Sequence, residues 1–182
     1  FAATTQGRLY ARNAVGGPNR TTNFRWAFPK VSQPTIGAIR HTPLVEFGNV
    51  YFGTDRFVPD GSADGVPKGR FYCLDMDTGA QKWMFQSLSG NSPGDWGTSG
   101  PTSATSAMLN DAGMGDTVFA QNQDGTLYAF AANGDSSGNA QVYWSTNELA
   151  TGATGSLTFT TMSVYDGSGL GTHLTSPVVL VP

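Results

Sequence analysis

Charge is scarce in this chain of 182 residues. Charged side chains make up 13% of the sequence, whereas ordinary globular proteins have about 25%. Ten Lys and Arg residues face 13 Asp and Glu residues, which gives a net charge of −3. Because no basic excess is available to neutralise phosphates, we expect neither nucleic acid nor an anionic membrane surface as the main partner.

Cysteine and long apolar runs are scarce as well. The single cysteine, Cys73, cannot form an internal disulfide, and no Cys/His spacing indicates zinc or haem. No apolar run approaches the roughly 18 residues of a membrane-spanning helix, so we expect no transmembrane segment. Phosphate-loop, zinc-protease and dinucleotide-binding motifs are also missing from the sequence. We therefore assign no catalytic residue and no metal ligand.

Glycine and proline, by contrast, are abundant. The chain has 24 Gly and 10 Pro, with frequent Ser and Thr and no convincing amphipathic helix pattern. This composition is typical of an all-β protein with many turns. The low charge and a start at Phe1 without Met favour a secreted or periplasmic protein, processed from, or part of, a longer one.

A repeat organises the sequence. The segments 7–11, 69–73 and 125–129 share one pattern: a glycine, a polar residue, Leu or Phe, a tyrosine, and a small residue. Each follows a strand-like run and precedes a turn and a tryptophan, namely Trp26, Trp83 or Trp144. The second unit shows four short strands, at 44–47, 49–54, 70–74 and 81–85. Four-stranded units at a period of roughly 40 to 60 residues predict a β-propeller.

The second repeat carries a family resemblance. Its residues 73–83, Cys-Leu-Asp-Met-Asp-Thr-Gly-Ala-Gln-Lys-Trp, resemble the tryptophan-docking repeat Ala-x-Asp-x-x-Thr-Gly-x-x-x-Trp of the quinoprotein (PQQ-like) propellers. Cys73 stands where the family has Ala, and the first and third units lack Asp-x-x-Thr-Gly. The resemblance covers most of 1–145 and resumes at 174–180.

The resemblance implies a structural role for the motif residues. In the family, the tryptophan of each blade packs between neighbouring blades. We therefore expect blade-docking roles for these matched residues: Trp26, Trp83, Trp144, Asp75, Thr78 and Gly79.

The repeat also divides the chain into about three blades of a partial ring. Further blades, or other chains, would complete that ring. The expected units are a blade without its first strand at 1–28, blades at 42–85 and 103–145, a loop insertion at 146–174, and the first strand of a further blade at 175–182.

The longest irregular stretches, 55–68, 86–105 and 145–172, are expected on one face of the propeller, where binding sites usually lie. They either bind a partner or contact neighbouring blades. Asp60 and Asp64 lie in a loop that could bind Ca²⁺ or simply be solvated. Asp95 and Trp96 are possible contact residues of the next loop.

Three functions are compatible with this sequence. The first is a non-catalytic scaffold or assembly subunit that binds proteins and holds no cofactor in this segment, like the outer-membrane assembly lipoprotein of the same family. The second is a fragment of a PQQ- and Ca²⁺-dependent dehydrogenase of alcohols, sugars or aldehydes. That enzyme class uses two adjacent cysteines, which are absent here, and a Glu ligand, for which neither Glu46 nor Glu148 has a matching context. The third is a carbohydrate- or surface-binding propeller.

Overall fold

The computed structural model describes most of the repeat region. The described residues are 1–15, 22–40, 42–54, 69–86, 105–108, 115–121, 126–146, 163–165 and 178–180. Within these ranges all regular structure is β-strand, so the all-β prediction is confirmed. No helix among the described residues is long and apolar enough to cross a membrane.

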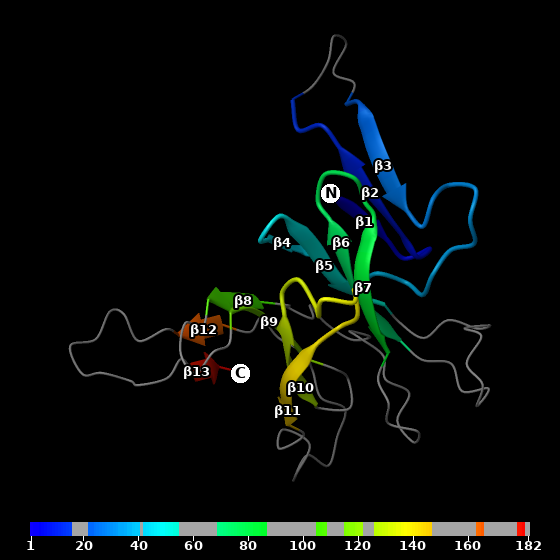
Figure 1. Ribbon diagram of the computed structural model, residues 1–182. Helices are drawn as coiled ribbons and strands as arrows, with labels where there is room; N and C mark the ends of the chain where they lie inside the picture. The colour runs from blue at the N-terminus through cyan, green and yellow to red at the C-terminus, as the bar shows by residue number, and fades with distance from the viewer. Residues whose placement is uncertain are drawn as a thin grey trace, which may run out of the picture.

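The strands form antiparallel sheets in which neighbours in sequence are neighbours in space (Figure 1). The first sheet contains β1 (Ala2–Thr4), β2 (Arg8–Arg12) and β3 (Phe24–Phe28). The second contains β4 (Leu44–Glu46), β5 (Asn49–Gly53), β6 (Arg70–Asp75) and β7 (Gln81–Gln86). The third contains β8 (Thr105–Met108), β9 (Asp116–Gln121), β10 (Leu127–Ala131) and β11 (Val142–Thr146).

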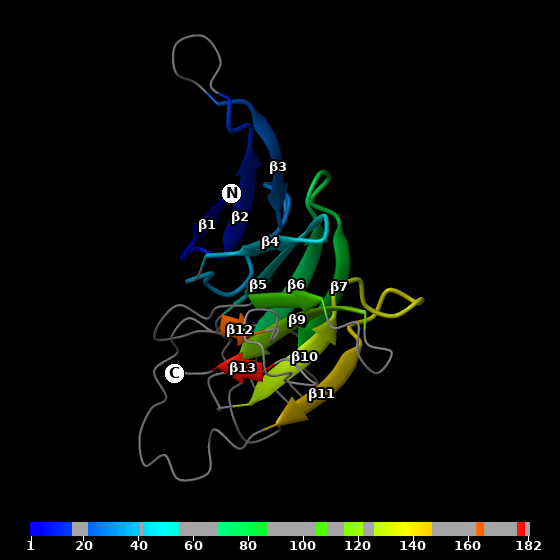
Figure 2. The ribbon, with the colours of Figure 1, turned by 90° about the vertical axis from the view of Figure 1, so that its left-hand side faces the viewer.

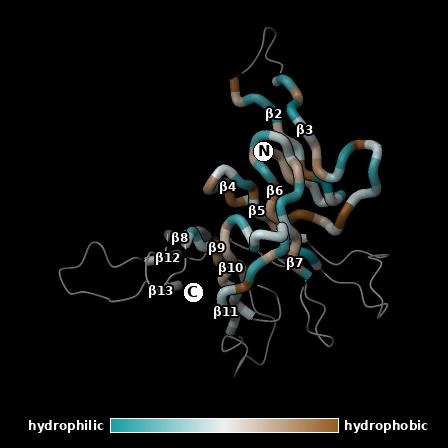
Figure 3. The backbone as a smooth tube through the Cα atoms, in the orientation of Figure 1, coloured by the Kyte–Doolittle hydropathy of each residue, from teal (hydrophilic) through white to brown (hydrophobic). Residues whose placement is uncertain are grey.

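The three sheets stack face to face in sequence order, as blades of a propeller do (Figure 2). The second sheet has both faces covered, so all five residues of β5 are buried. Val50 and Phe52 belong to the apolar cluster shared with the first sheet, whereas Tyr51 belongs to the cluster shared with the third. A strand buried on both faces needs apolar residues at consecutive positions. The β6–β7 turn, by contrast, is mostly teal to white in Figure 3. The chain is thus a partial propeller of about three blades.

Each of the three sheets has the same irregularity beside its tryptophan. The strand register shifts after the pair formed by the tryptophan and a small residue, which leaves one extra residue just before the tryptophan. Such a bulge increases the local twist and re-aims the neighbouring side chain. The three pairs are Ala11–Trp26, Cys73–Trp83 and Ala129–Trp144.

The chain ends with a separate pair of strands. β12 (Ser163–Tyr165) pairs with β13 (Val178–Leu180), and β12 lies beside β8 of the third sheet (Figure 2). β12 falls inside the predicted loop insertion at 146–174, and β13 falls inside the predicted first strand at 175–182. The second-blade strands begin where the sequence places them and differ by one residue at their ends.

Candidate functional site

The junction between the first and second sheets is built around Trp26. Its indole Nε1 donates a hydrogen bond of 3.1 Å to the carbonyl oxygen of Met76, in the turn between β6 and β7. The ring lies over Gly79, where an added Cβ atom would be 2.5 Å from the Cδ2 atom of Trp26. Gly79 also has a φ of +70°, which side chains other than glycine rarely adopt. The turn therefore needs glycine for its conformation and for the close approach of Trp26.

The β6–β7 turn is held in shape by Asp75. Its Oδ1 atom accepts hydrogen bonds from the amide of Asp77 (3.1 Å) and from the amide (2.9 Å) and hydroxyl (2.8 Å) of Thr78. The bonds from Thr78 are the main cause that lowers the pKa of Asp75, because they stabilise its charged form. The Asp-x-x-Thr-Gly motif thus forms a turn that presents the Met76 carbonyl group and Gly79 to the preceding sheet.

This turn gives the protein a pH-dependent stability. A carboxyl group whose pKa is lowered by folding stabilises the protein above its ordinary pKa, which is 3.8 for aspartate. That stabilisation is lost as the pH falls below 3.8 and through the pKa of the folded state. We therefore expect the acid-side loss of stability to be smaller in Asp75→Asn than in the wild type. Urea denaturation at several pH values between about 2 and 6, an interval that brackets the ordinary aspartate pKa, measures the free energy of unfolding of both proteins.

A conservative variant serves as the control for this experiment. Thr78→Val keeps the side-chain shape but removes the hydroxyl donor to Asp75, so its acid-side loss of stability should lie between those of wild type and Asp75→Asn. If Asp75→Asn lost as much stability at acid pH as the wild type does, the charged form of this carboxylate would not stabilise the turn.

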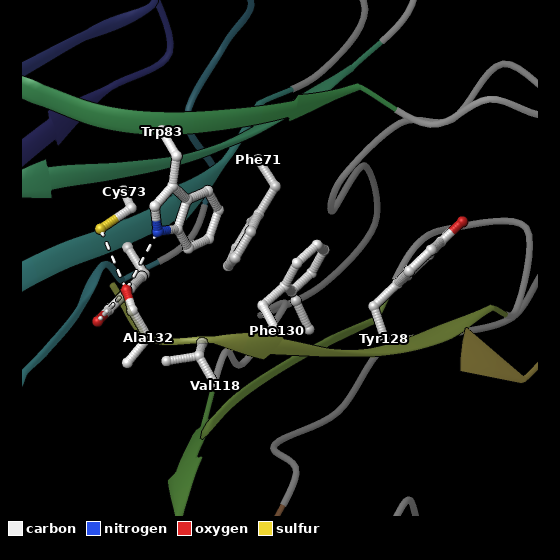
Figure 4. Packing of buried hydrophobic residues seen from close by; sticks show 9 residues of the cluster. Phe71, Cys73, Trp83, Val118, Tyr128, Phe130 and Ala132 are labelled. Carbon is white, nitrogen blue, oxygen red and sulfur yellow. Dashed lines mark hydrogen bonds between the residues drawn. The ribbon is translucent and has the colours of Figure 1, made fainter. Parts of the chain in front are cut away.

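The junction between the second and third sheets is centred on Trp83 (Figure 4). Trp83 is 1% exposed, and its Nε1 donates a hydrogen bond of 3.1 Å to the carbonyl oxygen of Ala132. Its ring stacks on Phe130, with centroids 5.5 Å apart and planes inclined by 27°. Gly134, with a φ of +74°, leaves no room for a Cβ atom, which would be 2.6 Å from Cδ1 of Trp83. The contact repeats that of Trp26 one sheet further along.

The carbonyl oxygen of Ala132 is the centre of a buried polar network. Besides the indole of Trp83, it accepts hydrogen bonds from the hydroxyl of Tyr51 (3.0 Å) and the thiol of Cys73 (3.7 Å). The amide nitrogen of Asn49 donates to the Tyr51 oxygen (2.8 Å) and to Oδ1 of Asn133 (3.1 Å). Side chains of the second sheet thus bind one backbone carbonyl that follows β10 of the third.

Burial keeps these groups protonated. Desolvation raises the pKa of the Cys73 thiol to about 12 and also raises the pKa of Tyr51. A protonated thiol and phenol can donate to a carbonyl group, whereas the thiolate needed for nucleophilic chemistry is disfavoured here. The network is suited to joining the second and third sheets.

The state of Cys73 can be tested directly. Because the thiol is fully buried and its pKa is about 12, we expect no reaction with a disulfide reagent at pH 8 in the folded protein. Unfolding in guanidinium should release one reactive thiol per chain, since Cys73 is the single cysteine. The absorbance of the thiolate that the reagent releases on reaction measures the labelling. Rapid labelling of one thiol per chain without denaturant would contradict the described burial.

The sequence analysis did not identify Gly134 or the carbonyl group of Ala132, because the turn of the third blade lacks the Asp-x-x-Thr-Gly motif. There, Oδ1 of Asp135 accepts hydrogen bonds from the amides of Ser137 (2.9 Å) and Asn139 (2.8 Å). This different carboxylate turn still presents a carbonyl group and a glycine, Gly134, to the preceding tryptophan. The Asn-Gly dipeptide at 133–134, a strong turn signal, was the available clue.

The other predicted site residues are less informative. Trp144 lies half-buried on β11, with its ring centroid 5.8 Å from that of Phe119. Asp60, Asp64, Asp95 and Trp96 lie outside the described residues.

An apolar groove opens beside the first junction. It has a volume of about 900 Å³ and is lined by residues 24 and 26–28 on β3, the following loop 30–33, and residues 78–81, which run from the β6–β7 turn to the first residue of β7. The guanidinium of Arg8 shapes this loop by donating to the carbonyl oxygens of Pro29 (2.9 Å), Lys30 (2.6 Å) and Gln33 (3.0 Å). The groove wall is therefore fixed by hydrogen bonds to β2.

The lining of the groove differs from that of a Ca²⁺ site. Hard cations such as Ca²⁺ take several oxygen ligands, mostly carboxylates. Among the described residues, the groove is lined by one cation, Lys30, and by no carboxylate. In the described part of the chain, no three His, Cys, Asp or Glu side chains gather as metal ligands would.

Comparisons with known proteins give little beyond this geometry. No protein-family model and no curated protein matches the sequence. Among solved structures the chain is similar to BamB from Moraxella catarrhalis, with 18% sequence identity and a TM-score of 0.46. The match covers 79% of this chain and 32% of the BamB chain, so this chain spans about a third of that protein's length. Similarity this weak assigns no function, and the class of protein, an all-β partial propeller, rests on the chain's own sheets.

Proposed function

We propose that this chain is a non-catalytic, PQQ-like β-propeller segment that serves as a protein-binding scaffold or assembly subunit in the periplasm or outside the cell. One observation carries the proposal. The buried polar and nucleophilic side chains that might have formed an active site, Asn49, Tyr51 and Cys73, donate hydrogen bonds into the junction between two sheets. They stabilise the stack of blades.

The surface of the first sheet supports the binding part of the proposal. Phe24 and Val31 are 52% and 68% exposed, and both line the apolar groove. Exposed apolar side chains gathered at one hollow on a rigid framework are typical of protein-interaction sites. A scaffold needs such a surface and a framework that does not deform when a partner binds.

Two measurements test this function. Chemical cross-linking of the protein in its native extract, followed by mass spectrometry, is expected to give a partner in a fixed ratio to this chain. Incubation with PQQ and Ca²⁺ is expected to give neither retained quinone absorbance nor dye-coupled oxidation of alcohols, sugars or aldehydes. Dye reduction that depends on PQQ would contradict the proposal and support a dehydrogenase, and specific glycan-array binding would support a carbohydrate-binding propeller.

A further inference from the structure

We propose that the groove between β3 and the start of β7 binds an extended apolar peptide segment that carries a carboxylate at one end. The inference rests on the proposed scaffold function and names the chemistry of the partner. Three features of the described residues carry it: an apolar lining, a free strand edge and a single unpaired cation.

The lining of the groove requires an apolar occupant. The groove is lined by Trp26 and Phe28 of β3 and by Val31 of the following loop, and Gly79 and Ala80 contribute from the β6–β7 turn. Its volume of about 900 Å³ is at the upper end of the range of ligand sites, which is about 300 to 1,000 Å³. A peptide with alternating apolar side chains would cover Val31 and Phe28 and remove them from water.

The edge of the first sheet favours an extended backbone. In the described part of the chain, the sheet order β1-β2-β3 leaves β3 with one strand partner and a free outer edge (Figure 1). Unpaired amide and carbonyl groups on such an edge can bind another strand. Four residues of β3 line the groove, so a strand bound to this edge would place side chains beside the groove.

The charge pattern selects the end group of the peptide. Lys30 is the single charged residue among those that line the groove, and no described carboxylate pairs with its ammonium group. The nearby cation Arg25 is already engaged, because its Nη2 lies 3.2 Å from Oδ1 of Asp77. A carboxylate on the incoming peptide would give Lys30 its partner at the rim, where charge mainly contributes specificity.

Fluorescence anisotropy with a defined probe tests the proposal. The probe is a fluorescein-labelled peptide of alternating valine and threonine, about six residues long like a typical strand, with a free C-terminal carboxylate. Val31→Asp should weaken its binding by about tenfold or more, because a charge enters the apolar contact. Val15→Asp is the matched control, since Val15 is 85% exposed and does not line the groove; its affinity should equal that of the wild type.

Two further comparisons separate the charge from the backbone contribution. Lys30→Gln should weaken binding of the carboxylate peptide severalfold and leave the C-terminal amide peptide unaffected. A peptide with alternate N-methylated amides should bind about tenfold more weakly, because it cannot pair with the edge of β3. Decanoate that displaced the peptide at equal affinity would overturn the assignment, since it has no backbone groups to pair.

The outcomes distinguish the groove from the scaffold function itself. Absence of peptide binding, or equal affinity in wild type and Val31→Asp, overturns the groove proposal. If the cross-linked partner is then still captured by Val31→Asp, the scaffold function stands and its binding surface lies elsewhere. If no partner is captured by the wild type either, the scaffold function fails as well.

Discussion

Replacing Trp83 with alanine is expected to lower the free energy of unfolding by about 3 to 5 kcal/mol, the usual cost of removing a large buried aromatic side chain. The substitution leaves a cavity between the second and third sheets and removes the stacking on Phe130. It also removes the hydrogen bond to the carbonyl oxygen of Ala132. Urea denaturation, monitored by far-ultraviolet circular dichroism, measures the change in the free energy of unfolding.

Two controls identify the source of this effect. Trp83→Phe keeps an aromatic ring against Phe130 but loses the indole donor, so it should cost less than Trp83→Ala, by retaining most of the packing. Phe24→Ala removes an aromatic side chain that is 52% exposed, and we expect a change within about 1 kcal/mol. Equal losses in Trp83→Ala and Phe24→Ala would mean that Trp83 does not join the sheets.

Gly79→Ala is expected to destabilise the protein by about 2 to 5 kcal/mol. A φ of +70° costs a non-glycine residue about 1 to 2 kcal/mol. The new methyl group would also displace the ring of Trp26, and overpacking of this kind costs about 1 to 3 kcal/mol. The same denaturation experiment measures the sum.

Gly48 offers a matched control for the backbone part. Its φ is also +70°, but a Cβ atom there would meet nothing within 4 Å. Gly48→Ala should therefore show the conformational cost of about 1 to 2 kcal/mol alone. The excess in Gly79→Ala over Gly48→Ala is the contribution of the contact with Trp26, and no excess would contradict that contact.

The second blade could be predicted from the sequence because its local signals agree. Alternating strands, the Asp-Thr-Gly turn and the tryptophan all point to the same four-stranded unit, and β5 and β6 begin where expected. The role of Gly79 follows from a turn that needs a positive φ, which is a local property of the chain.

The partners of these residues were harder to predict because they are distant in sequence. Trp83 binds the carbonyl group of Ala132, 49 positions away, and a backbone carbonyl has no sequence signature. The groove is lined by loop 30–33 and by residues 78–81, which are far apart in sequence. The loop is held by Arg8, and a single arginine in a sequence does not indicate such a role. Such sites follow from how sheets stack, which hydrophobic periodicity alone does not specify.

The central claim is that Trp26 and Trp83 each join their own sheet to the next, and Cys73 reports on the second of these junctions. Its thiol lies at the second junction, beside the Ala132 carbonyl group that Trp83 binds. The measurement is the rate of Cys73 labelling under native conditions in Trp83→Ala and Trp26→Ala, each corrected for its own global unfolding. The claim predicts local opening in Trp83→Ala, with labelling at least about tenfold faster than in Trp26→Ala. Equal corrected rates in the two variants would contradict it.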